Sequence, residues 1–167
     1  MSVDFSQLSP TLNINLHWET VSERDVPAQI HKSPYPKSAT PAPTGPQIYR
    51  WVLRNCNGVP VAMYIGQTRE MKRRLYGYCH GHQRPTDQLN RIRDKFREVE
   101  SSGGSVKLQL LQFDPFSLNG FEFSKKRLAF APARHMLENL LLCEARTKGV
   151  ELLSKDCDGA GRNVKLV

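Results

Sequence analysis

The most constraining feature of this chain is a turn dipeptide between two runs of strand-like residues. Residues 48–54 and 59–65 are rich in aromatic and branched apolar side chains, which favour strands. Asn57-Gly58 stands between the two runs, and this dipeptide favours a two-residue type I′ turn because both turn positions need a positive φ. The sequence therefore predicts a tight antiparallel β-hairpin.

The predicted turn also sets the register of the hairpin. Two turn residues would pair Trp51 with Tyr64. Two positions further from the turn, Tyr49 would pair with Gly66, so the two tyrosines become diagonal neighbours on one face of the sheet. Pro60 cannot donate to the ladder, which predicts an edge or a bulge close to the turn.

Residue periodicity predicts the remaining elements. Apolar residues at helical spacing follow the hairpin and recur from about residues 86 and 132, which indicates three helices. Residues 12–18 alternate as in a half-buried strand, residues 106–113 form another strand, and residues 114–130 are expected to be irregular. The buried faces of the first two helices should carry Met71, Leu75, Tyr78, Leu89, Ile92, Phe96 and Val99. The fold class is α/β (α+β), with a small antiparallel or mixed three-stranded sheet flanked by helices.

Polar and special residues mark the expected helix ends. Thr68 can cap the first helix, and Thr86 or Asp87 can cap the second. Residues 101–104, Ser-Ser-Gly-Gly, should end the second helix, and Pro132 suits the start of the third.

The N-terminal part differs in composition from the rest of the chain. Residues 27–46 hold six of the eleven prolines, a density that excludes a helix or a central strand. We therefore divide the chain into an N-terminal strand and Pro-rich arm, residues 1–46, and a domain of residues 47–167. The strand in the arm could pair with the domain or with a second copy of the chain, which leaves a homodimer through the arm open.

The charge of the chain points to an anionic partner. The 167 residues carry a net charge of +8, and the segment 47–113 holds 12 Lys and Arg against 5 Asp and Glu, so +7 of the excess lies there. Nucleic acid is the simplest partner for such an excess, although a basic surface can also serve only solvation. No apolar run reaches the roughly 20 residues that cross a bilayer, which predicts no membrane partner.

Compartment follows from the cysteines and the N-terminus. The four cysteines are irregularly spaced, and residues 1–10 contain neither a basic cluster nor an apolar stretch of the kind that signal peptides carry. We expect a reduced, cytoplasmic protein.

The residues around the hairpin suggest phosphodiester chemistry. Hydrolysis of a phosphodiester needs a base for the attacking water and positive charge at the phosphate. A tyrosine can act as the base if neighbouring cations lower its pKa from about 10. Arg74 can grip a phosphate with its planar guanidinium, and Glu138 can offer oxygen to Mg²⁺.

In these residues the chain resembles the GIY-YIG nuclease family, over about residues 47–167. The strand motifs are Gln47-Ile48-Tyr49 and Tyr64-Ile65-Gly66, and in that family the second glycine lets the chain turn into the next helix. The resemblance implies Mg²⁺ or Mn²⁺ as the cofactor. It implies catalytic roles for Tyr49, Tyr64, Arg74, Tyr78, Glu138 and Asn163, with Glu138 as the metal ligand.

Three departures from the family pattern are visible. Gln47 replaces the first glycine, the segment between the tyrosines is longer than the usual family hairpin, and Tyr78 stands where several members carry histidine. Tyr78 lies one turn from Arg74 on the same helix face and could replace that group or pack; His80 is the alternative. Glu144 competes with Glu138 as the metal ligand, because it lies nearer the centre of the apolar face of its helix.

The sequence thus predicts a Mg²⁺-dependent endonuclease that acts on double-stranded DNA, in restriction, repair or a mobile element. The alternative is a nucleic-acid-binding module without catalysis. The expected phosphate contacts are Arg50, Arg69, Lys72, Arg73, Arg91, Lys95, Lys125, Lys126 and Arg127.

Overall fold

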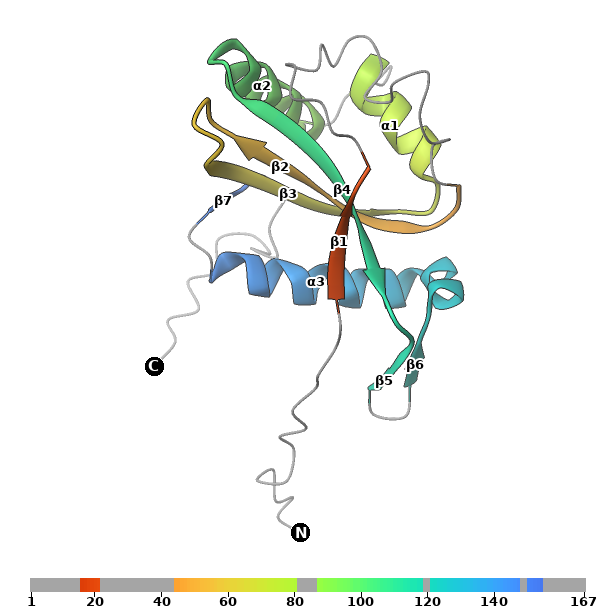
Figure 1. The fold of residues 1–167 in the computed structure, drawn as a ribbon. Helices are drawn as coiled ribbons and strands as arrows, with labels where there is room; N and C mark the ends of the chain where they lie inside the picture. Colours follow the sequence, from red (N-terminus) through yellow and green to blue (C-terminus); the bar gives the residue numbers. More distant parts are fainter. Residues whose placement is uncertain (1–15, 22–43, 81–86, 119–120, 148–149, 155–167) are drawn as a thin grey trace.

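The fold is a mixed five-stranded sheet with helices on both faces, as seen in a computed structural model (Figure 1). The structure describes residues 16–21, 44–80, 87–118, 121–147 and 150–154. The strand order is β1-β4-β2-β3-β7. The strands are β1 (Leu16–Thr20), β2 (Gln47–Arg54), β3 (Pro60–Thr68), β4 (Ser105–Phe113) and β7 (Glu151–Leu152). The described helices are α1 (Met71–His80), α2 (Asp87–Ser101), α3 (Ala131–Arg146) and the short 3₁₀-helix η3 (Lys125–Ala129).

The three predicted strands form the centre of a wider sheet. β2 pairs antiparallel with β3 and with β4, as expected. The sheet gains β1 on β4, antiparallel, and β7 on β3, parallel, so it has five strands instead of three. The arm strand of the sequence analysis, residues 12–18, corresponds to β1 at 16–20, and it pairs with the domain of its own chain.

The register predicted for the hairpin is confirmed. Trp51 lies opposite Tyr64, and Tyr49 lies opposite Gly66. β3 continues to Thr68, three residues beyond the predicted end, so Gly66 lies inside the strand and not at a turn into the helix.

The connecting turn has three residues, and the predicted two-residue turn is wrong. The N–H of Asn55 bonds the carbonyl of Val59 at 2.9 Å, and the N–H of Gly58 bonds the carbonyl of Asn55 at 2.9 Å, which closes a loop of residues 56–58. The Asn55 side chain also accepts the N–H of Val59 at 3.0 Å, and Gly58 adopts the positive φ that a three-residue loop requires. A register shift between Leu53 and Arg54 offsets the extra residue, so the bulge expected beside Pro60 is present.

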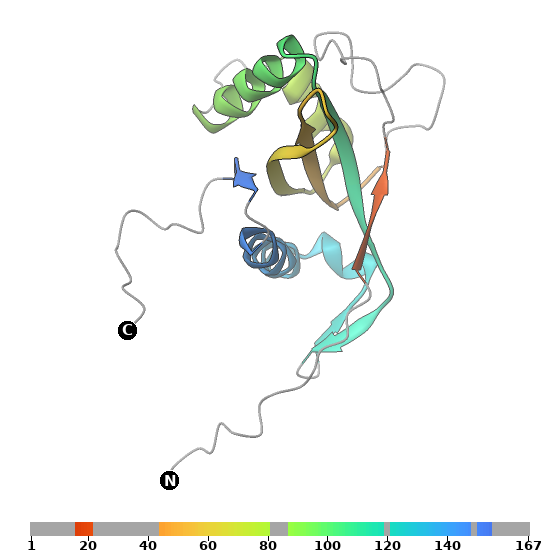
Figure 2. The same ribbon diagram turned by 60° about the vertical axis from the view of Figure 1, so that its left-hand side comes forward.

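Two separate cores lie on the two faces of the sheet. Figure 2 shows α3 viewed nearly along its axis below the sheet, with α1 and α2 on the opposite side. The upper core joins β2, β3 and β4 to α1 and α2, and every residue predicted for the buried faces of these two helices is in it. The lower core joins the other face of the same strands to α3. Because successive strand residues point to opposite faces, Tyr49 belongs to the upper core and Ile48 to the lower one.

Within the stretch 114–130, residues 116–118, 121–123 and 125–129 form regular elements, contrary to the expected irregular segment. β5 (Phe116–Leu118) and β6 (Phe121–Phe123) form a second, two-stranded sheet that projects beyond the main one (Figure 1). The rings of Phe116 and Phe123 stack at 4.8 Å, and this aromatic pairing gives the short hairpin a core that its length alone would not provide. η3 follows and leads directly into α3.

None of the helices in the described residues is long and apolar enough to cross a bilayer.

Candidate active site

Three tyrosines meet on the α1 side of the sheet. Tyr49 comes from β2, Tyr64 from β3 and Tyr78 from α1. The hydroxyls of Tyr49 and Tyr78 share a hydrogen bond of 3.0 Å. The ring centroids of Tyr49 and Tyr64 are 6.0 Å apart, and the ring of Tyr78 lies 6.4 Å from each of them. Tyr78 therefore takes part in the tyrosine cluster and does not only fill the core.

Gly66 makes room for the tyrosine cluster. A Cβ atom at this position would lie 2.8 Å from both Cε1 and the hydroxyl of Tyr64, and 3.0 Å from the hydroxyl of Tyr49. Both hydroxyls thus lie against the bare backbone of Gly66. The expected reason for this glycine, a turn into the helix, is wrong; the strand needs it because the phenols approach too closely for any side chain.

Arg74 joins the tyrosines to the carboxylate predicted from the resemblance. The pKa of the Arg74 guanidinium is raised, first by its attraction to Tyr49, and further by Tyr78, Tyr64 and Glu138. Arg74 is half-buried on the first turns of α1, one helical turn before Tyr78. Arg74 therefore interacts electrostatically with each of the other side chains on which the sequence argument depended.

Glu138 approaches this point from α3, across the end of the sheet. Its side chain is 20% exposed, and Oε2 lies 3.6 Å from Nδ1 of His135. Burial raises the pKa of the Glu138 carboxyl, while His135, Arg74 and the backbone N–H of Gln67 act in the opposite direction. A half-buried carboxylate offers hard oxygen donors of the type that Mg²⁺ accepts.

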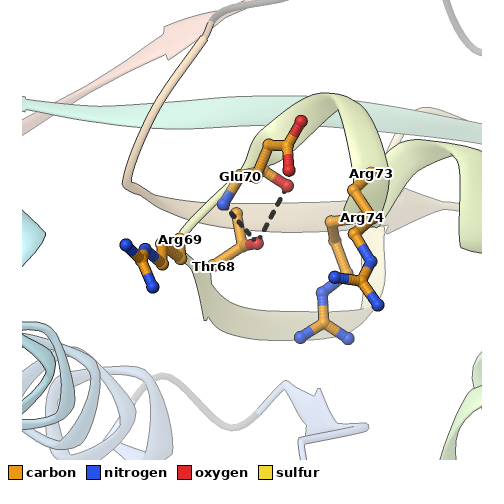
Figure 3. Close-up of a pocket in the computed structure, with 5 residues that line it drawn as sticks. All are labelled: Thr68, Arg69, Glu70, Arg73 and Arg74. Carbon is orange, nitrogen blue, oxygen red and sulfur yellow. Dashed lines mark hydrogen bonds between the residues drawn. The ribbon is translucent and has the colours of Figure 1, made fainter.

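A cavity of about 680 Å³ opens beside Arg74, and the described residues that line it are Thr68, Arg69, Glu70, Arg73 and Arg74. Figure 3 shows that Arg73 and Arg74 extend in the same direction from α1, whereas Arg69 points from the other side of the turn. The Thr68 hydroxyl accepts the N–H of Glu70 at 3.1 Å and donates to its carbonyl at 3.0 Å. The three guanidinium groups and the start of α1 make this cavity suitable for an anion.

The role predicted for Thr68 at the helix start needs a correction. The carbonyl of Glu70 accepts the N–H of Arg74 at 3.2 Å, so Glu70 occupies the capping position of α1. Thr68 lies two residues earlier and stabilises the tight turn between β3 and α1. Through this turn it sets where Arg69 and Arg74 stand relative to each other.

Burial raises the pKa of Tyr49 and Tyr78, whereas the sequence argument expected neighbouring cations to lower the pKa of the catalytic tyrosine. Tyr49 and Tyr78 are 0% and 1% exposed, and burial raises the pKa of both hydroxyls well above 10. Arg74 lowers these pKa values, but its effect is smaller than that of burial. Tyr49 and Tyr78 are therefore neutral phenols at neutral pH in this structure.

Glu144, the alternative carboxylate, lies at another place. It lines a small pocket together with Trp18 and Arg50, and it attracts the Arg50 guanidinium. Glu138 is the carboxylate that interacts with Arg74. The geometry therefore groups Glu138, and not Glu144, with the tyrosines.

Arg50 lies on the opposite face of the sheet from Tyr49, since strand neighbours point to opposite sides. Its guanidinium stands 4.3 Å from the ring centroid of Trp18, and its Nε donates to Gln109 at 2.6 Å. Burial lowers the pKa of Arg50 to about 10. Arg50 thus helps to hold β1 on the sheet. The phosphate contact predicted for Arg50 is not supported, because its guanidinium is engaged by Trp18 and Gln109.

The other predicted phosphate contacts lie in two places: on α2, and around the start of α1 or on η3. On α2, Lys95 is bonded to Glu98 at 3.0 Å and lies 3.4 Å from Glu151, while Arg91 is exposed. The remaining cations are exposed and lie around the start of α1 or on η3: Arg69, Lys72, Arg73, Lys125, Lys126 and Arg127. Asn163 and the side chain of His80 lie outside the described residues.

Sequence reasoning missed Arg134 and Gln67. Arg134 is 6% exposed on α3, and its Nε donates to Oε1 of Gln67 at 2.7 Å. Its Nη1 donates to the carbonyls of Leu128 and Ala129. The available signal was the position of an arginine on the apolar face of α3, one turn before Glu138, because arginine is rarely buried without partners.

Among the described residues, no three or more His, Cys, Asp and Glu side chains gather into a metal-binding group. A cation held at Glu138 would therefore take one carboxylate and complete its coordination with water and phosphate oxygens. Comparisons of the chain with protein-family models, curated proteins and solved structures found no match. What the site does is thus inferred from its own geometry.

Proposed function

We propose that the chain is a metal-dependent endonuclease that hydrolyses phosphodiester bonds in double-stranded DNA, as members of the GIY-YIG family do. The observation that carries the proposal is the meeting of two strand tyrosines, Arg74 and Glu138 at one end of the sheet. These groups come from β2, β3, α1 and α3, so only the folded chain brings them together.

The cations beside the cavity would bind the substrate. Arg74 has a planar guanidinium that can bind two phosphate oxygens, and its charge is stabilised by its neighbours. Arg69 and Arg73 line the same cavity and would hold the flanking phosphates. Binding by backbone phosphates alone would give affinity that falls steeply with salt.

The tyrosines would divide the remaining work. Tyr49 is fully buried and bonded to Tyr78, so its neutral hydroxyl is fixed and would orient the neighbouring phenol of Tyr64. Tyr64 is 8% exposed and is the strand tyrosine that water reaches more readily. We assign to the phenolate form of Tyr64 the acceptance of a proton from the attacking water, and Arg74 is the cation that interacts with this side chain.

Glu138 would hold Mg²⁺ or Mn²⁺ through its carboxylate oxygens. A bound divalent cation would supply charge neutralisation at the phosphate and at the leaving oxygen. Because burial raises the pKa of Glu138, loss of a proton from this carboxyl would accompany cation binding at mildly acidic pH.

The test is cleavage of supercoiled plasmid DNA by the full chain with and without Mg²⁺. Arg74→Ala and Glu138→Ala should each abolish cleavage, whereas Glu144→Ala should leave it unchanged because Glu144 stands beside Arg50. Cleavage that survives both Arg74→Ala and Glu138→Ala would refute the assignment. DNA binding without any metal-dependent cutting would favour the alternative, a non-catalytic nucleic-acid-binding module. The exposed cations of α1 and η3 support that alternative.

For the role of the arm, the biological pathway and the cellular compartment we make only general proposals. β1 pairs with β4 of the same chain, so its backbone groups on that side are already occupied. We retain a homodimer through the arm as a proposal that analytical ultracentrifugation can test. A cytoplasmic nuclease of restriction, repair or a mobile element fits the proposed activity.

A further inference from the structure

A second cationic surface stands next to the candidate active site. η3 presents Lys125, Lys126 and Arg127 in succession, and all three side chains are exposed. Within the described residues, none of the three lies at ion-pair distance from a carboxylate. Lys125 is oriented by a hydrogen bond of 2.5 Å to Oε1 of Gln112 on β4. The surface therefore offers three exposed positive charges, and the side chain of Gln112 separates Lys125 from the Glu19 carboxylate that bonds the same amide.

α2 shows the opposite arrangement. Lys95 is bonded to Glu98 at 3.0 Å, and Arg97 is bonded to Asp94 at 2.9 Å. A solvated helix that only needs solubility carries such mixed charges. The contrast between α2 and η3 argues that the charge on η3 serves an external anion.

Arg134 ties η3 to the active site. Its Nη1 donates to the carbonyls of Leu128 and Ala129 at the end of η3, and its Nε donates to Gln67 at 2.7 Å. Gln67 in turn gives its backbone N–H to the Glu138 carboxylate. Three hydrogen-bond steps thus join the cationic surface to the proposed metal ligand.

We propose that Lys125, Lys126 and Arg127 bind phosphates of the same DNA duplex that enters the active site, and that Arg134 fixes the position of this grip relative to Glu138. The proposal rests on the proposed function for the identity of the substrate. It adds a second contact region outside the active site and a positioning residue, Arg134, that joins the two.

Adjacent cations dominate this surface, although exposed aromatic rings lie beside them. The Arg127 guanidinium lies 5.5 Å from the ring centroid of Phe121, so a cation approaches this ring, which remains 38% exposed. Three successive cations bind phosphates of any sequence. Duplex DNA, whose phosphates lie outside the stacked bases, is the partner that fits them.

The test measures DNA binding by the full chain in EDTA, where no divalent cation is present to support cleavage. Fluorescence anisotropy with two duplexes of unrelated sequence gives the binding constant over a range of KCl concentrations. In K125Q/K126Q/R127Q the slope of log K against log salt should decrease by about 2 to 3, since each phosphate contact contributes about 0.9. The loss should be the same for both duplexes.

The matched control removes three cations that lie away from both surfaces, Arg93 and Arg97 on α2 and Arg146 at the end of α3, in R93Q/R97Q/R146Q. Its slope should change by less than about 1, although the formal charge lost is equal. Equal slope changes in the two triple variants would overturn the proposal in favour of diffuse charge, and an unchanged slope in the η3 triple would overturn it outright. A loss confined to one duplex would show base reading and would also overturn it. If the η3 triple unfolds, K126Q alone should lower the slope by about 0.9.

The link through Arg134 has its own test. Gln67→Ala removes the side-chain acceptor of Arg134 but keeps the backbone N–H that reaches Glu138. DNA binding and its salt slope should be unchanged, while the cleavage rate should fall by roughly 10-fold to 100-fold, as for a small misplacement of reacting groups. Unchanged cleavage in Gln67→Ala would overturn the positioning role.

These outcomes separate the inference from the proposed function. A wild-type chain that cuts DNA, with an η3 triple that binds DNA like wild type, contradicts the second contact region alone. A chain that binds DNA through η3 but never cuts contradicts the proposed activity alone. A wild-type chain that does not bind DNA at all contradicts both.

Discussion

Substitution of Gly66 by alanine tests whether the tyrosine cluster is the active centre. The added Cβ would lie 2.8 Å from the hydroxyl and Cε1 of Tyr64 and 3.0 Å from the hydroxyl of Tyr49. Non-bonded heavy atoms involving carbon prefer about 3.5 Å or more, so the phenols or the strand must move by about 0.7 Å. β3 is paired with β2 at Gly66, and the Ser154 hydroxyl holds the backbone of the neighbouring Ile65 on the other side, so the tyrosine side chains are the parts that yield.

The size of the effect follows from this displacement. Overpacking of a core typically costs about 1 to 3 kcal/mol in the free energy of unfolding. A misplacement of about 1 Å at a reacting centre costs roughly 100-fold in rate. Gly66→Ala should therefore fold, lose about 1 to 3 kcal/mol of stability, and cleave DNA roughly 50-fold to 100-fold more slowly at saturating Mg²⁺.

The assays are urea unfolding and single-turnover cleavage at saturating enzyme. Val106→Ala is the matched control, because Val106 is buried in the same core but pairs with Leu53 at the turn end of the hairpin. Loss of its buried methyl groups should cost about 1.5 kcal/mol or more without moving the tyrosines. A folded Gly66→Ala protein that cleaves as fast as wild type would refute the role given to the cluster.

Three further predictions concern charge and burial. Burial raises the folded-state pKa of Tyr49 and Tyr78 above the unfolded value of about 10, so their contribution to stability is complete below pH 10 and declines above it. Tyr78→Phe should therefore flatten the alkaline fall of the unfolding free energy, measured by urea unfolding over a pH series. A variant with the same pH profile as wild type would contradict this. Burial also raises the pKa of Glu138, so Glu138→Gln should lose cleavage but be at least as stable as wild type near pH 7 in thermal unfolding. A clear drop in the melting temperature of the variant would contradict this prediction. Burial raises the pKa of Glu100 to about 7, and its Oε1 has no hydrogen-bond partner among the described residues. The free energy of unfolding should therefore fall as pH rises from 4.5 through 7, and Glu100→Gln should remove that fall.

Local sequence signals predicted the parts of the fold that local forces determine. The apolar spacing of α1 and α2 identified their buried faces, because one stripe of each helix must face the sheet. The register of β2 and β3 was also correct, although the turn was assigned the wrong length. Asn55 widened the loop and a bulge removed the offset, and these two compensating features cannot be separated from the turn dipeptide alone.

Long-range pairing accounts for what the sequence could not predict. β7 has two residues and is held by Ser154, whose hydroxyl accepts the N–H of Ile65 at 2.9 Å and donates to its carbonyl at 2.8 Å. No periodicity can be read from two residues. The same holds for Arg134, whose partners lie on β3 and η3 and whose burial depends on all three elements meeting.

For the candidate site, order and spacing predicted the members but not their states. The sequence indicated Tyr49, Tyr64, Arg74 and Glu138, and the structure brings them together. It could not reveal that burial outweighs Arg74 in setting the pKa of Tyr49, since burial depends on the packing of α1 and α2 over the sheet. It also could not choose between Glu138 and Glu144, because both lie on one helix and only the position of α3 separates them.

The most direct measurement of the central claim is a structure of the full chain with Mn²⁺ and a short DNA duplex. We predict an ion bound to a carboxylate oxygen of Glu138 at about 2.0 to 2.2 Å, with a phosphate oxygen shared between that ion and the Arg74 guanidinium. An ion bound elsewhere, or a duplex whose phosphates do not reach Arg74, would contradict it.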